Sequence, residues 1–101
     1  CVVSNCRGHG FHPGTALKWS VFSNNIAYAN KADGLYFCAR VRGCSVVGNV
    51  FHHNGGDGIG GLGGGGDTFN VVSNNVCEFN GRCGIEAANG AENSIAGNVC
   101  L

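Results

Sequence analysis

Two aspartates stand at matching places in the chain and are the first candidates for chemistry. Each is followed by a glycine and an apolar residue, in the segments Asp33-Gly34-Leu35 and Asp57-Gly58-Ile59. If these segments lie on neighbouring strands, the two carboxylates are about 5 Å apart. Such a pair either shares a proton, with one pKa raised, or binds a cation such as Ca²⁺. The alternative without chemistry is that each carboxylate bonds the backbone of its own turn.

Histidines and an arginine recur near this pair. Alignment of the repeated segments places His9 in one column with His53, and His12 in another column with Arg82. Imidazole and carboxyl groups are common general acids and bases, and a guanidinium neutralises developing negative charge. Surface histidines without any such role are the alternative.

The segment Cys6-x-x-His9-x-x-His12 has residue types that bind metals. A zinc site needs about four converging ligands, and the sequence offers no second pair. Cys6 also occupies a position that is apolar in the other repeats. Packing of Cys6 in the wall is therefore favoured over zinc binding.

The glycine-rich run from Gly60 to Asp67 has the flexibility of a phosphate-binding loop. It lacks the Lys and Ser or Thr that such a loop places next, and no helix is predicted after it. A tightly bent corner in the longest repeat explains the run better.

These candidate residues are positioned by an internal repeat. Five segments each place an apolar residue three positions before an asparagine and another apolar residue directly after it. The anchoring asparagines, which are 20, 24, 26 and 23 residues apart, are Asn5, Asn25, Asn49, Asn75 and Asn98. A glycine column follows, with Gly14, Gly34, Gly58 and Gly84 as its members. A period in the low twenties with variable length is typical of a solenoid whose strands keep register while its loops vary.

Each repeat is predicted to form short strands of about 3–5 residues, separated by turns rich in Asn and Gly. Asparagines stacked at ~4.8 Å form ladders of mutual hydrogen bonds. The predicted ladder contains Asn25, Asn49, Asn75 and Asn98. The interior is predicted to be filled by the apolar column of Phe22, Val46, Val72 and Ile95. These features predict an all-β fold.

The repeat resembles that of the pectin-lyase-like superfamily over essentially the whole chain, with apolar-x-x-Asn-apolar, a further Asn, and then Gly-Ile or Gly-Leu. The resemblance implies a right-handed parallel β-helix, or β-solenoid, of about four coils with 20–26 residues each. We expect a single domain over residues 1–101, with a segment or repeating subunit of a longer assembly as the alternative.

Residues 10–14 and 25–35 are most similar to the carbohydrate-modifying branch of that superfamily, which includes mannuronan epimerases. That branch carries Asp-Pro-His-Asp after Gly-Phe. Here the matching positions read His12-Pro13-Gly14-Thr15, so only the proline is kept.

The resemblance to β-helix polysaccharide enzymes implies acid pairs and calcium sites. An epimerase or lyase needs a base, a proton donor and a cation that neutralises the uronate carboxylate. The candidate catalytic residues are His12, Asp33, Asp57, His53 and Arg82. Asp33 and Asp57 are also the candidate calcium ligands, and no other cofactor is expected.

Seven cysteines in 101 residues indicate an oxidising compartment, so we expect an extracellular or cell-surface protein. Cys77 and Cys100 share a column in adjacent coils, which brings them within disulfide reach. Cys38 and Cys44 flank one turn and form a second candidate pair. Buried, unpaired thiols are the alternative for each.

The sequence argues against binding to nucleic acid and against a membrane-spanning segment. Charged residues make up 12% of the chain and the formal net charge is zero, whereas a nucleic-acid binder needs a basic face. The sequence also contains no apolar run near the ~20 residues that span a bilayer.

Two functional hypotheses follow. The first is a structural solenoid that self-associates head to tail into filaments through its uncapped ends, where Cys1, Cys6 and Cys100 lie, and that contacts polysaccharide along its flat faces. The second is a carbohydrate-active enzyme, a polyuronate epimerase or lyase, or a fragment of one. The incomplete motif and the small number of coils favour the structural role.

Overall fold

The computed structural model describes residues 1–63, 66–88 and 92–101. These residues form β-strands and turns without a helix, so no helix among them is long and apolar enough to cross a membrane. Twelve short strands follow one another along the chain: β1 (Val2–Ser4), β2 (Val21–Ser23), β3 (Ile26–Tyr28), β4 (Leu35–Tyr36), β5 (Ser45–Val47), β6 (Val50–His52), β7 (Ile59–Leu62), β8 (Val71–Ser73), β9 (Val76–Glu78), β10 (Ile85–Ala87), β11 (Ser94–Ala96) and β12 (Val99–Cys100).

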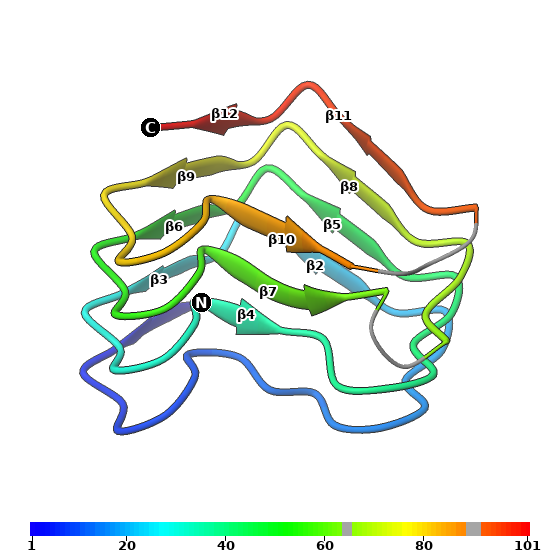
Figure 1. Ribbon diagram of the computed structural model, residues 1–101, viewed down its shortest axis with the longest axis horizontal. Coiled ribbons are helices and arrows are strands. Elements are labelled where there is room, and N and C mark those ends of the chain that lie inside the picture. Colours follow the sequence, from blue (N-terminus) through cyan, green and yellow to red (C-terminus); the bar gives the residue numbers. More distant parts are fainter. Residues whose placement is uncertain (64–65, 89–91) are drawn as a thin grey trace.

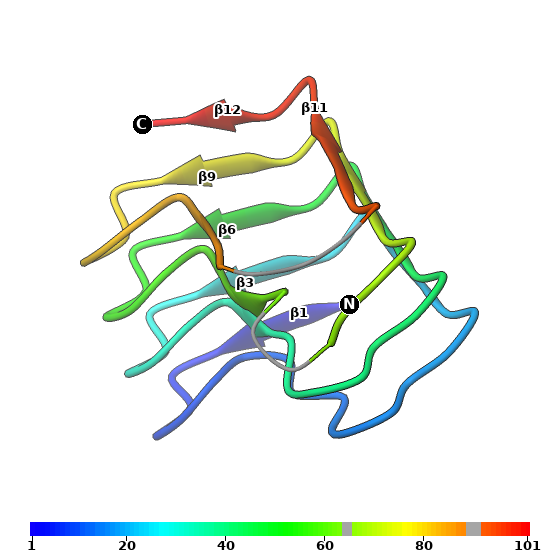
Figure 2. The ribbon, with the colours of Figure 1, turned by 45° about the vertical axis from the view of Figure 1, so that its right-hand side comes forward.

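The strands coil into a right-handed solenoid whose axis leads from the N-terminus towards the C-terminus (Figure 1). Successive coils add strands to three parallel sheets, with the orders β1-β3-β6-β9-β12, β2-β5-β8-β11 and β4-β7-β10. Figure 2 shows the strands of one sheet stacked above one another, one from each coil. The predicted all-β class and the parallel solenoid of about four coils are confirmed.

The interior is filled by apolar columns that run along the solenoid axis. Phe22 pairs with Val46, Val46 with Val72, and Val72 with Ile95, so the column predicted from the repeat is confirmed. Its middle members are fully buried, whereas Ile95 in the last coil is 41% exposed. Burial of the middle coils therefore depends on the coils on either side.

Asparagines at the corner between two sheets satisfy the backbone of neighbouring coils. The Nδ2 atom of Asn49 donates to Oδ1 of Asn75 at 3.0 Å and to the carbonyl of Phe22 at 2.9 Å. The same pattern links Asn25 to Asn49 and Asn75 to Asn98. Such a ladder gives buried polar groups the hydrogen bonds that they would otherwise make with water.

The first coil has a different register from the one predicted by the repeat. Phe11 bridges to Leu35, and the amide of Gly10 donates to the carbonyl of Asp33. Gly10, rather than Gly14, therefore stands in the glycine column. The reason is steric: a Cβ at Gly10 would lie 2.7 Å from the Gly34 carbonyl oxygen, whereas a Cβ at Gly14 would meet nothing.

Strand β7 contains an irregularity on the sheet that carries the candidate site. Ile85 pairs with Ile59, but Ala87 pairs with Leu62, so β7 has one residue more than β10 over this stretch. Gly61 adopts a φ of 76°, and a Cβ there would lie 2.3 Å from the carbonyl oxygen of Phe37. The first glycines of the predicted bent corner thus form a β-bulge. Residues 64–65 of that run lie outside the described residues.

Candidate acid–base site

The outer face of sheet β4-β7-β10 carries two neighbouring columns of side chains. Four successive coils supply the first column, which consists of His12, Tyr36, Gly60 and Glu86. The second column lies at the corner just before the strands and consists of His9, Asp33, Asp57 and Cys83. Because Leu35 and Ile59 are buried in the core, their neighbours in the first column face outward.

Asp33 connects its own coil to the coils before and after it. Its Oδ1 accepts a hydrogen bond from the Asp57 amide at 2.6 Å, and its amide donates to Nδ1 of His9 at 3.2 Å. The same His9 nitrogen lies 3.2 Å from Asp33 Oδ2. Nδ1 of His9 therefore lies within reach of both the backbone amide and the carboxylate of Asp33.

Asp57 is fully buried, and its two oxygens have different surroundings. Oδ1 accepts a hydrogen bond from the Cys83 amide at 2.8 Å. Oδ2 is buried without a hydrogen-bond partner, and the nearest cation is NH1 of Arg82 at 3.8 Å. An unsatisfied buried oxygen on a carboxylate is unfavourable, so this atom needs a donor that the fixed backbone does not supply.

Glu86 is the side chain that can supply this donor. Its pKa is raised above the usual range, chiefly because the protonated form makes a hydrogen bond with Asp57 and also because the Asp57 charge repels the ionised form. Arg82, whose NH2 lies 3.9 Å from Glu86 Oε2, acts in the opposite direction. Asp57 and Glu86 thus form a carboxyl pair in which one member holds a proton more tightly.

Gly60 stands between Tyr36 and Glu86 in the first column and carries no side chain. A Cβ at Gly60 would lie 2.6 Å from Asp33 Oδ2 and 3.1 Å from Asp57 Oδ2. Any side chain at this position would collide with the Asp33 carboxylate and crowd that of Asp57. The glycine therefore lets both carboxylates lie close against the β7 backbone.

Aromatic rings cluster beside the Asp33 carboxylate. The ring of Tyr36 lies 4.4 Å from the His9 ring and 5.3 Å from the His12 ring, with the His12 ring nearly parallel to it. Flat aromatic surfaces beside carboxyl groups suit a ligand with apolar C–H faces and hydroxyl groups, such as a sugar.

Four of the five predicted catalytic residues lie in this region: His12, Asp33, Asp57 and Arg82. The fifth, His53, lies at the corner after β6, where its Nδ1 is 2.8 Å from Nδ1 of His52 and its ring is tilted against the Phe79 ring. The predicted pairing of His9 with His53 fails because the register of the first coil places His9 beside Asp33. Glu86 was missed, although its place after Ile85 puts it in the outward column of Tyr36.

The predicted calcium ligands Asp33 and Asp57 remain candidates as a pair. In the part of the chain that the structure describes, no group of three or more His, Cys, Asp or Glu side chains is arranged to hold a metal ion. The side chains of the described residues therefore supply, by themselves, neither the six oxygen ligands of a calcium site nor the four ligands of a zinc site.

The seven cysteines are free thiols in the structure, so neither predicted disulfide is formed. Cys77 and Cys100 are register partners, but burial raises the pKa of Cys77 to about 12, and the neighbouring Cys100 adds to the shift. A thiol with such a pKa has little of the reactive thiolate at neutral pH. Cys38 faces the Thr15 hydroxyl, whereas Cys44 is buried against the carbonyls of Leu17 and Arg42.

The cysteines expected to take part in assembly lie at different depths. Cys1 and Cys100 are exposed, and Cys6 is half-buried with its thiol 3.8 Å from the Ser4 carbonyl oxygen.

Comparison of the chain with protein-family models, with curated proteins and with solved structures gave no match in any of the three.

Proposed function

We propose that the outer face of sheet β4-β7-β10 is the acid–base centre of a carbohydrate-active β-solenoid. The observation that carries the proposal is the buried, unpartnered Oδ2 of Asp57 beside Glu86, whose pKa is raised. A carboxyl group with a raised pKa beside a second carboxylate is an arrangement that general acid–base catalysis uses.

In this proposal Glu86 gives its proton to the oxygen of the glycosidic bond that breaks. Asp57 Oδ2 accepts a proton in the same step. In hydrolysis that proton comes from the attacking water, and in elimination it comes from the carbon next to a uronate carboxylate. Arg82 is the cation that neutralises the uronate in the second case. The same pair of carboxyl groups serves both reactions, so the products identify the reaction.

The parallel solenoid supports the proposal as a scaffold, because its stacked coils place outward side chains in fixed columns. The resemblance of the repeat to the pectin-lyase-like superfamily favours polysaccharides as substrates, and polyuronates among them. An extracellular location, as expected from the cysteine content, belongs to the same proposal. Glu86 gives this chain a proton donor that does not depend on the incomplete Asp-Pro-His-Asp motif.

The test is incubation of the purified protein with polyuronates and with neutral polysaccharides. New reducing ends report cleavage, ultraviolet absorbance reports unsaturated uronate from elimination, and sugar analysis of intact polymer reports epimerisation. Glu86→Gln is expected to lower the rate by a factor on the order of 10²–10⁴. Glu78→Gln, on the other outer face at β9, is the matched control and is expected to keep the wild-type rate. No change in any polymer, or equal rates for both variants, would contradict the proposal.

Assembly into filaments remains a second candidate with its own observation. Strands β1 and β12 each have one edge without a partner strand among the described residues, and open edges recruit further strands. Negative-stain electron microscopy with and without reductant, together with size-exclusion chromatography, tests this candidate. Unbranched filaments would support it and a concentration-independent monomer would contradict it.

A further inference from the structure

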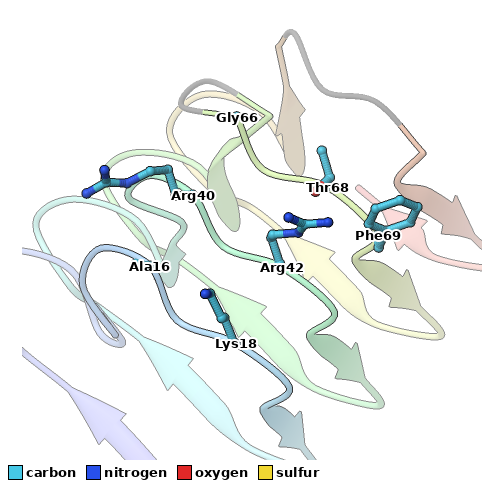
Figure 3. A pocket seen from close by; sticks show the side chains of 7 residues that line it. All are labelled: Ala16, Lys18, Arg40, Arg42, Gly66, Thr68 and Phe69. Carbon is cyan, nitrogen blue, oxygen red and sulfur yellow. The ribbon is translucent and has the colours of Figure 1, made fainter.

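A second polar region lies at the corner between sheet β4-β7-β10 and sheet β2-β5-β8-β11. A cavity of about 630 Å³ opens there across three successive coils. Its lining residues are Ala16, Lys18, Arg40, Arg42, Gly66, Thr68 and Phe69 (Figure 3). Lys18, Arg42 and Thr68 are register neighbours, so their side chains project from adjacent coils in one column.

The hollow results from the alternation of long and short side chains. Ala16, Gly66 and Thr68 occupy little space beside Lys18, Arg40 and Arg42. The guanidinium of Arg42 lies 5.4 Å from the centre of the Phe69 ring, which positions its planar group at the edge of the cavity. The cavity thus combines cationic groups with an aromatic surface.

The positive charges of this cavity are not compensated by ion pairs. None of Lys18, Arg40 and Arg42 has a carboxylate within 4.0 Å among the described residues, whereas Arg82 in the acidic region approaches two. The chain contains six Lys and Arg residues, so half of them line this one cavity. A neighbouring carboxylate, Asp67, is fully buried and accepts hydrogen bonds from the Val41 and Gly63 amides.

One exposed aromatic ring, that of Phe69, lines the cavity, and another, that of Trp19, belongs to the residue after Lys18. Phe69 is 47% exposed and Trp19 is 76% exposed. A Cβ added to Gly43 would collide with the Trp19 ring, so that ring lies close against the backbone directly after Arg42. Such rings are surfaces on which the C–H face of a sugar stacks.

We propose that this cavity binds an acidic sugar unit of a glycan, through a carboxylate or sulfate group held by Lys18, Arg40 and Arg42. Guanidinium groups match the planar geometry of carboxylate oxygens and also bind sulfate oxygens. Nucleic acid is disfavoured as the ligand because the chain outside the cavity carries six acidic residues and only three basic ones. The site lies on another face from the acid–base centre and goes beyond the proposed enzymatic function.

Calorimetric titration of the whole chain tests this site. The probes are an oligouronide, a sulfated oligosaccharide, a neutral oligosaccharide of equal length, inorganic sulfate and a single-stranded DNA oligonucleotide. We expect saturable binding of one of the two acidic oligosaccharides that weakens as salt is added, and little binding of the neutral one. The acidic probe that binds identifies the anionic group. Binding of sulfate alone or of DNA more tightly than either glycan would overturn the proposal, as would no binding at all.

Variants separate the cavity from general electrostatic attraction. Arg42→Ala is expected to weaken binding about tenfold or more, the change that follows from loss of one charge-assisted pair. Arg7→Ala removes an exposed arginine outside the cavity and is the matched control, expected to keep the affinity. Glu86→Gln is also expected to keep it, so binding succeeds or fails independently of catalysis. Equal losses in Arg42→Ala and Arg7→Ala would overturn the proposal.

Discussion

Two buried aspartates, Asp57 and Asp67, show how one solenoid treats the same side chain in two ways. Both are fully buried, and both stand in turns that lead into or out of sheet β4-β7-β10. Asp67 uses both oxygens on backbone amides, at 2.8 Å and 3.0 Å. Asp57 uses one oxygen at 2.8 Å and leaves the other without a partner.

The difference indicates which carboxylate serves the fold and which is available for chemistry. The Asp67 carboxylate accepts hydrogen bonds from buried backbone amides that cannot reach water, as the Asn ladders do elsewhere in the chain. Asp57 keeps an unsatisfied oxygen beside Glu86, which costs stability and raises the pKa of a neighbour. A local loss of stability of this kind is expected at a functional site.

The largest expected effect is that of Asp57→Asn on activity. Asparagine keeps an oxygen for the Cys83 amide but removes the proton acceptor, so the rate on the cleaved polymer is expected to fall by at least about a hundredfold. Initial rates of polymer cleavage measure this change. A variant with more than half of the wild-type rate would show that Asp57 is not the base.

The stability of the two aspartate variants is expected to differ in direction. Asp67→Asn places an amide N–H₂ against a backbone N–H and is expected to lower the free energy of unfolding by about 1–3 kcal/mol. Asp57→Asn removes a buried charge and offers a donor to Glu86, so we expect an unchanged or raised stability. Urea denaturation of both variants checks the comparison. Equal losses in the two variants would remove the distinction between the sites.

A smaller effect is expected from Arg82→Ala on the pH dependence of the rate. The proton donor must be protonated, so activity is expected below the raised pKa of Glu86 and to be lost as pH rises through it. Arg82 favours the ionised form of Glu86, so its removal is expected to move this limb to higher pH. Profiles of kcat/KM against pH measure the shift, with Arg82→Lys as the charge-preserving control. A shift to lower pH would contradict the assignment of Glu86.

The smallest expected effect is that of Arg42→Ala on stability. The side chain is exposed and has no ion pair among the described residues, so the free energy of unfolding is expected to change by no more than about 0.5 kcal/mol. The same urea experiment measures it. A loss comparable with that of Asp67→Asn would show that the cationic cavity serves the fold instead of a ligand.

The repeat made most of the fold predictable. Spacing of the anchor asparagines gave the parallel sheets and the column from Phe22 to Ile95, because strands in a solenoid keep register while their loops change length. The first coil was misaligned, since Gly14 matches the sequence pattern but Gly10 meets the steric requirement beside Gly34.

The candidate site was predictable only where it coincides with the repeat. Asp33 and Asp57 occupy equivalent positions, so their proximity followed from the period. Glu86 lies opposite Gly60 at a β-bulge. Neither the bulge nor the raised pKa of Glu86 can be predicted from the repeat pattern. The cationic cavity depends on which side chains of three variable loops face the same way, and spacing alone does not determine that.

The most direct test is the titration of the Glu86 carboxyl carbon by nuclear magnetic resonance, in the wild-type chain and in Asp57→Asn. We predict a pKa above the usual glutamate range in the wild type, and a fall towards that range when the Asp57 charge is removed. An ordinary Glu86 pKa in the wild type, or a raised pKa that Asp57→Asn leaves unchanged, would contradict the acid–base pair on which the proposed function rests.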